Sequence, residues 1–353
     1  MLELKKDLLQ FAFPDVHPEA KFDVTFKRTL RIPDDGKEYP LPPGLGNFPL
    51  RAIDDFKGRV PARWVEHGGV MFPMFQSEAL WVSFATHGNY RRSSHYPVAV
   101  KVSTGKVSAV TGDEWTPGLK AKDYLVAPPQ RWIDGYGIGD GVVRQFVAAP
   151  LGWGFSAEEQ ITGKAESGGI QIEVIPMKGD VFERRFPLRR SESPILRAMG
   201  LDEFNGFADD CVVMDYARSV DMSLAPGGKM KQQIHDDPFD INDWAVEHGS
   251  RVFVHLANSL VWEAITGHAP PSPPTTASAY TNAGLPWFEH YVDDAKTLKG
   301  SGKLASLKSV LAMGFQKGLG ILPENQSAPI KPEAVKQLAD KPKSPHEVRE
   351  GSW

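Results

Sequence analysis

The sequence predicts an α+β fold in which a strand-rich first half forms a mostly antiparallel sheet and the second half contributes helices. Residues 22–32 alternate apolar and polar side chains, as half-buried strands do. Residues 97–111 can pair with themselves as a hairpin. After Pro187 apolar residues recur at helical spacing instead. Because strands and helices come in separate blocks, the order favours α+β over alternating βαβ units.

Three further elements are expected in the first hundred residues. Residues 2–11 place apolar side chains at helical spacing and predict a short amphipathic helix. Residues 33–49 are rich in proline and glycine, which predicts a loop. Residues 71–84 are the most apolar part of this region, and we expect a buried strand followed by a helical turn there.

The hairpin is the clearest element of the sequence. A two-residue turn at Thr104 and Gly105 would set Val98, Val100 and Val102 opposite Thr111, Ala109 and Val107. One register then satisfies both strands, as expected of a real hairpin. Further strands are expected at residues 143–149, 170–175 and 181–186.

The second half is expected to be richer in helix. Its predicted helices cover residues 193–199, 202–216, 259–266 and 297–319, and one strand covers residues 252–256. Gly267 follows the third of these helices, in the position where a helix commonly stops. The strand would join the sheet of the first half, so we expect one compact domain over residues 1–322 and a loosely ordered, proline-rich polar tail over 323–353.

Composition and charge exclude several classes of partner. The formal net charge is −4, which argues against a surface built to bind nucleic acid or an anionic membrane. No run of apolar residues is long enough to cross a bilayer. Residues 1–13 lack the apolar core and cleavage site of a signal peptide, so a cytoplasmic location is expected.

The motifs of common enzyme families lack their proper context. The glycines of residues 135–141 do not follow the G-x-G-x-x-G spacing of a dinucleotide site. Residues 98–101 match the lysine strand of protein kinases, but the other kinase motifs are missing. The leading hypothesis is therefore a non-enzymatic protein that binds a small molecule or a protein partner, without a metal or cofactor.

The expected binding site is a groove lined by tryptophan and glycine. Six tryptophans lie beside proline, glycine or aspartate and could either line such a groove or cap the core: Trp115, Trp132, Trp153, Trp244, Trp262 and Trp287. The loops at residues 134–141, 151–159 and 225–237 would form it. Within them and beside them, the predicted ligand-binding residues are Trp132, Asp134, Trp153, Gly227 and Gly228.

The alternative is an enzyme with a dispersed acid–base site that acts on a small anionic substrate. Its candidate catalytic residues are Glu158, Glu159, His235 and Asp237, with Lys229 stabilising negative charge. Residues 226–231 could form an anion-binding loop or a plain one. Residues 235–237 fit an acidic turn or, less simply, a site for a divalent cation.

Several stretches also carry a resemblance. They are MFPMFQSEALWVSF (71–84), RQFVAAPLGWGFSAEEQITG (144–163), GGIQIEVIP (168–176) and LPWFEHY (285–291). Together they make residues 65–310 resemble a family of uncharacterised microbial proteins. The resemblance implies a stand-alone protein, and it implies no activity and no catalytic residue.

Overall fold

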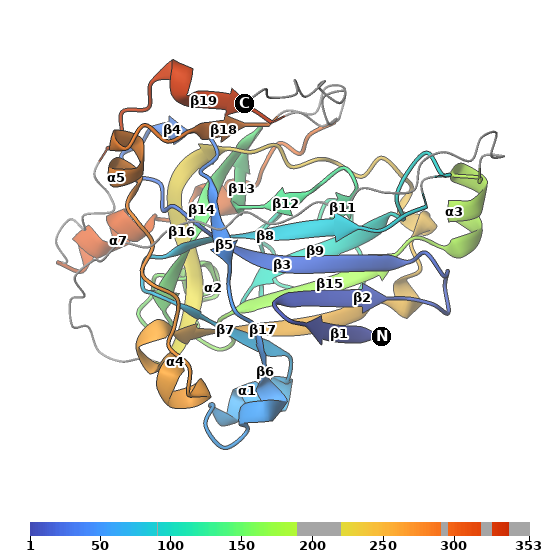
Figure 1. Cartoon of the computed structure of the whole chain (residues 1–353), viewed down its shortest axis with the longest axis horizontal. Helices are drawn as coiled ribbons and strands as arrows, with labels where there is room; N and C mark the ends of the chain where they lie inside the picture. Colours follow the sequence, from blue (N-terminus) through green and yellow to red (C-terminus); the bar gives the residue numbers. More distant parts are fainter. Residues whose placement is uncertain (90, 189–219, 291–295, 319–326, 339–353) are drawn as a thin grey trace, which may run out of the picture.

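Strands dominate the molecule. The computed structural model describes residues 1–89, 91–188, 220–290, 296–318 and 327–338. In these residues 17 strands form one large, mainly antiparallel sheet, and seven short α-helices lie around its periphery (Figure 1). The predicted α+β class is therefore wrong. The longest described helix has only eight residues, and the helices expected at 193–199 and 202–216 lie outside the described residues.

The chain begins as a meander of three strands. They are β1 (Leu2–Lys5), β2 (Leu8–Ala12) and β3 (Lys21–Thr29), each antiparallel to the next. The helix expected over residues 2–11 is wrong. Lys6 turns the chain with a positive φ of 55°, and Leu9 and Phe11 are the buried side chains of β2. These two residues are two positions apart and therefore lie on one face of a strand. The prediction was wrong because other apolar residues in this segment also recur at helical spacing.

Beyond β3 the sheet runs through seven more strands, each paired with the one before it. In spatial order they are β8 (Ala79–Thr86), β14 (Val142–Pro150), β16 (Asp221–Lys231), β17 (Ser250–Asn258), β15 (Ile170–Pro176), β9 (Val98–Thr104) and β11 (Leu125–Ala127). The strands expected at 143–149, 170–175 and 252–256 are confirmed. β17 also pairs with β7 (Val70–Met74), so the late strand joins the first half as predicted. Residues 71–84 are thus two strands.

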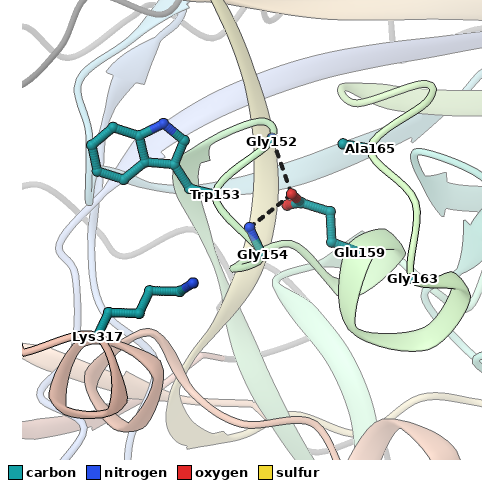
Figure 2. A pocket seen from close by; sticks show the side chains of 7 residues that line it. All are labelled: Gly152, Trp153, Gly154, Glu159, Gly163, Ala165 and Lys317. Atoms are coloured by element: carbon teal, nitrogen blue, oxygen red, sulfur yellow. Dashed lines mark hydrogen bonds between the residues drawn. The ribbon is translucent and has the colours of Figure 1, made fainter.

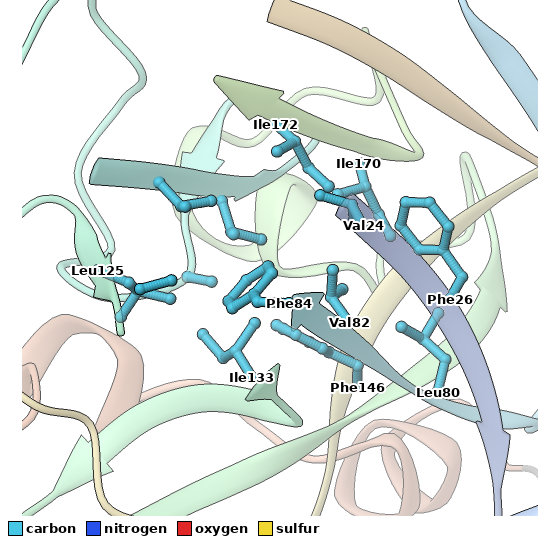
Figure 3. Close-up of a cluster of buried hydrophobic side chains, with 14 of the residues drawn as sticks. Val24, Phe26, Leu80, Val82, Phe84, Leu125, Ile133, Phe146, Ile170 and Ile172 are labelled. Carbon is cyan, nitrogen blue, oxygen red and sulfur yellow. The ribbon is translucent and has the colours of Figure 1, made fainter. Parts of the chain in front are cut away.

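The sheet curls around a single large core. Figure 3 shows Val24 and Phe26 of β3 in one cluster with Leu80 of β8 and with Ile170 and Ile172 of β15. β3 and β8 are neighbours, but β15 is four steps further along the ladder from β8, so the sheet must bend to bring their inner faces together. Burying each such side chain contributes about 1.5–3 kcal/mol, which makes this shared interior the main source of stability.

The predicted hairpin exists, but its turn lies one residue later than predicted, so each residue of the first strand pairs two positions further along the second. Thr104 pairs with Val107 and Ser103 with Ser108, so β9 meets a two-residue strand, β10 (Val107–Ser108). The turn is therefore at Gly105 and Lys106, and Gly105 supplies its positive φ of 55°. The rest of β9 pairs with β11 and β15, because these longer ladders satisfy more of its backbone.

Two predictions of secondary structure type need correction. Residues 181–186, expected as a strand, belong mainly to α3 (Gly179–Arg185). The long helix expected over 297–319 is split into α6 (Gly302–Ala305) and α7 (Val310–Gln316). Ser301 and Ser309 each cap a new helix start. The helix at 259–266 is confirmed as α4 (Ser259–Thr266), and it stops at Gly267 with a φ of 75°.

The remaining described elements are short. They are β4 (Glu38–Tyr39), β5 (Gly44–Asn47), β6 (Arg51–Ala52), β12 (Trp132–Ile133), β13 (Gly135–Gly139), β18 (Trp287–Glu289), β19 (Val335–Gln337), α1 (Ala62–His67), α2 (Ala157–Thr162) and α5 (Ala277–Asn282). The first of them show that the loop expected at 33–49 carries two small strands. β19, from the predicted tail, pairs with β18. Within the described part of the chain no helix is both long and apolar enough to cross a membrane.

Candidate functional site

The tryptophans divide into two groups. Trp244, Trp262 and Trp287 are at most 2% exposed and belong to the core. Trp115, Trp132 and Trp153 are half-buried, so these three keep one face toward solvent. Trp115 stacks on the guanidinium of Arg251, whose central carbon lies 4.4 Å from the ring centroid. Trp132 and Trp153 each line a separate hollow.

The first hollow, which we name the Trp153 hollow, follows the end of β14. Its volume is about 500 Å³, and it is lined by Gly152, Trp153, Gly154, Glu159, Gly163, Ala165 and Lys317. Figure 2 shows Lys317 reaching toward the loop from the end of α7, while Glu159 faces the same loop from α2. The hollow is thus built from two chain segments that are far apart in sequence.

Glu159 holds the loop that carries Trp153. Its Oε1 accepts hydrogen bonds from the backbone amides of Gly152 (3.0 Å) and Gly154 (2.7 Å). Its Oε2 accepts from the Ser156 amide (3.1 Å) and hydroxyl (2.7 Å). Ser156 in turn caps α2, so the pair forms a capping box. Four donors therefore surround this carboxylate, and its role in the fold is to fix the loop.

A glutamine side chain joins the two walls of the Trp153 hollow. The Gln160 Oε1 accepts from the backbone amide of Lys308 at 2.8 Å, and its Nε2 donates to the Lys308 carbonyl at 3.0 Å. Below this clamp, Val310 and Met313 of α7 pack in one apolar cluster with Trp153 and other residues. The position of Lys317 relative to the loop is therefore set by both polar and apolar contacts.

Glu158, the neighbouring candidate, is directed away from the Trp153 hollow. It is 1% exposed. Its carboxylate accepts hydrogen bonds from the backbone amides of Lys106 (3.3 Å), Ser167 (3.3 Å) and Gly168 (2.9 Å). It thereby ties the β9–β10 turn to the start of β15, and its lone pairs are occupied by the protein itself.

The second hollow, which we name the Gln130 hollow, lies past the end of β16. It is lined by Leu41, Pro129, Gln130, Arg131, Trp132, Gln232, Gln233, His235 and His290. Its volume is only about 10 Å³, roughly the room that one water molecule needs. The chain around it is closely packed.

Glutamine side chains connect the chain segments around the Gln130 hollow through hydrogen bonds to the backbone. Gln130 donates to the carbonyls of Trp132 (2.7 Å) and Gln233 (3.3 Å) and accepts from the His235 amide (2.9 Å). Gln232 accepts from the Asp134 amide at 3.0 Å. These bonds supplement the short strand β12 and satisfy backbone groups in the segment that follows β16, so the amides serve the fold.

Asp134 lies behind Trp132. Its Oδ2 accepts a hydrogen bond from the indole Nε1 of Trp132 at 2.9 Å, while its Oδ1 has no hydrogen-bond partner among the described residues. Burial raises the pKa of this carboxyl to about 8. Asp134 is therefore protonated at neutral pH.

His235 and Asp237 differ in their surroundings. His235 is 4% exposed and lines the Gln130 hollow. The Asp237 carboxylate accepts from the Tyr124 hydroxyl (2.5 Å), the Trp244 indole (2.9 Å) and the Phe239 amide (2.7 Å). Among the described residues no three His, Cys, Asp or Glu side chains are grouped to hold a metal ion.

Gly227, Gly228 and Lys229 lie inside β16, so the loop expected at residues 226–231 is wrong. A Cβ on Gly227 would come within 2.5 Å of the Val147 Cγ2, and one on Gly228 within 2.3 Å of the Pro33 carbonyl oxygen. The two glycines therefore allow neighbouring chain segments to approach closely. Lys229 pairs with Glu38 through the backbone.

The predicted site residues do not gather in one place. Trp153 and Glu159 line the Trp153 hollow, whereas Trp132 and His235 line the other. Sequence reasoning missed Lys317, which lines the first hollow, and Gln160, which bonds to the segment that carries Lys317. Nothing local in the sequence signals that the end of α7 meets a loop some 160 positions earlier.

Comparison of the chain with protein-family models, with curated proteins and with solved structures gives no match in any of the three. The resemblance to a family of uncharacterised microbial proteins therefore stays a prediction.

Proposed function

We propose that this chain is a binding protein that holds a small molecule in the Trp153 hollow. The observation that carries the proposal is an open hollow of about 500 Å³ beside a half-buried tryptophan. Sites for small molecules commonly enclose about 300–1,000 Å³ and combine apolar surface with a few polar groups. Trp153 offers a flat apolar face, and the glycines on either side of it let a ligand approach the backbone.

The rigidity of the loop supports the proposal. Glu159 binds the amides of Gly152 and Gly154, and Gln160 fixes the opposite wall. A site that is ordered before binding loses less conformational entropy when the ligand arrives. The same contacts that stabilise the fold would therefore increase affinity.

The alternative, an enzyme with a dispersed acid–base site, has less support. The carboxylates of Glu158, Glu159 and Asp237 each accept at least three hydrogen bonds from the protein. A general base needs a lone pair that can reach substrate. His235 lines a different hollow from Glu159, so the two cannot share a substrate without rearrangement.

The test is a thermal-shift screen of naphthalene-based acids, amides and amines against three forms of the chain. A ligand that binds only the folded chain raises the free energy of unfolding by mass action, by about 2.7 kcal/mol at a free ligand concentration of a hundred times Kd. The melting temperature rises as a result. We expect at least one compound to stabilise the wild type and Trp115→Ala but not Trp153→Ala. Trp115 is the matched control because it is also half-buried. Equal stabilisation of Trp153→Ala would contradict the proposal.

A further inference from the structure

The charged side chains beside the Trp153 hollow differ in how many hydrogen bonds and ion pairs they already make within the protein. Four neutral hydrogen-bond donors of the loop hold the Glu159 carboxylate and stabilise its negative charge there. Next to Ala165, Glu166 forms ion pairs with Lys106 at 2.8 Å and with Lys164 at 3.2 Å. These charges offer little net attraction to a ligand.

Lys317 is the only cation among the described residues that line the hollow. Its Nζ lies 5.7 Å from the centroid of the Phe155 ring. It is also 3.5 Å from the point where a Cβ on residue 154 would stand, so the glycine there leaves space in front of the ammonium group. A cation–π contact at an exposed site is weak. The ammonium therefore keeps most of its capacity to bind an anion.

We infer that the ligand of the Trp153 hollow is a small aromatic monocarboxylic acid, an inference that rests on the proposed function. Its ring would lie against Trp153 and its carboxylate would face Lys317. A single ammonium is a compact point charge with three donors, which matches one carboxylate. A polyanion would instead call for several cations or for an arginine fork.

Lys317 should make the Trp153 hollow select ligands by their charge. The Lys317 ammonium can donate a hydrogen bond to a carboxylate or to the carbonyl oxygen of a neutral amide of the same shape, but only the carboxylate also gains the attraction between opposite charges. An ammonium of the same shape meets a like charge. The expected order of affinity is acid, then amide, then amine.

The experiment measures the dissociation constants of 2-naphthoate, 2-naphthamide and 2-naphthylmethylammonium by calorimetry at low salt. In the wild type we expect the acid to bind at least about tenfold more tightly than the amide. Lys317→Met should remove this preference while the amide still binds. The control Lys303→Met removes an exposed lysine on α6 that pairs with Asp113, and it should keep the preference.

Two outcomes would overturn the inference alone. One is equal affinity of the wild type for the acid and the amide, and the other is a full preference for the acid in Lys317→Met. In either case a small molecule still binds. Failure of all three compounds to bind the wild type would instead count against the proposed function itself.

Discussion

The two hollows look alike in sequence and differ in what their polar groups already bind. Each has a half-buried tryptophan and a nearby acidic side chain, Glu159 in one and Asp134 in the other. The Trp153 hollow is open, with about 500 Å³ of space, whereas the Gln130 hollow has about 10 Å³. Polar residues around a hollow therefore indicate a binding site only where some of them are not already bonded within the protein and can bond a ligand.

The Gln130 hollow is small because the side chains around it form hydrogen bonds to backbone groups and draw the chain segments together. The segment at 130–134 contains only the two-residue strand β12, and the segment at 232–235 belongs to no strand, so buried backbone groups there need other partners. Gln130 and Gln232 supply them. Substitutions in this region should therefore change stability, whereas those around Trp153 should change binding.

The largest effect is expected for Asp134→Asn. The pKa of Asp134 is raised to about 8 in the folded chain, from an ordinary value of 3.8. The folded state thus binds a proton that the unfolded state has released, and stability falls as pH rises between these values. By pH 7 the loss amounts to about 4 kcal/mol. Asparagine can still accept from Trp132 and does not ionise, so the variant should be more stable at pH 7.

Urea unfolding of Asp134→Asn and wild type at pH 4.5 and pH 7 checks this prediction. The stability difference should shrink toward pH 4.5, because Asp134 then approaches the same protonation in both states. A difference that is the same at both pH values would contradict the protonation of Asp134. Affinity in the Trp153 hollow should not change.

The next largest effect is expected for Gln130→Ala. This side chain is 4% exposed and makes three hydrogen bonds to backbone groups. Leaving those groups unpaired should destabilise the chain by about 3 kcal/mol. Gln337→Ala, at an exposed position on β19, is the control and should cost less than about 0.5 kcal/mol. Similar stability of the two variants by urea unfolding would refute the proposed role of Gln130.

The smallest effect is expected for Gln160→Ala, which removes the clamp on Lys308. Loss of these two bonds, and of a third from the Gln160 Nε2 to the Phe155 carbonyl, should cost about 1 kcal/mol of stability because all three are partly exposed. Because Lys317 would then be held less firmly against the loop, affinity for 2-naphthoate should fall about fivefold. Calorimetry measures both changes. Unaltered affinity would mean that the apolar contacts of α7 alone position Lys317.

Sequence patterns predicted the parts of the fold whose signal is local and unambiguous. β14, β15 and β17 were found because apolar residues alternate in them or form a continuous buried run. Residues 2–11 and 181–186 were assigned the wrong type because short apolar runs fit either period. The expected α+β class failed for the same reason, since the later helical patterns gave only short helices in the described residues.

The candidate site was predicted only in part. Trp153 was identified from loop composition, and it does line a hollow together with Gly152 and Gly154. Glu159 was expected as an acid or base, because sequence does not reveal that four donors of its own loop surround it. Gly227 and Gly228 looked like a turn, whereas close neighbours in the curled sheet require them. The error at Gly227 and Gly228 concerns contacts between segments that are distant along the chain, whereas the error at Glu159 concerns the conformation of a single loop.

The most direct test of the central claim is ¹⁹F NMR of the chain labelled with 5-fluorotryptophan. The Trp153 and Trp132 resonances can be assigned as those missing from Trp153→Phe and Trp132→Phe. On addition of 2-naphthoate, the Trp153 resonance should shift with saturation while the Trp132 resonance stays in place. A saturable shift of Trp132 with Trp153 unmoved would contradict the claim and assign binding to the Gln130 hollow.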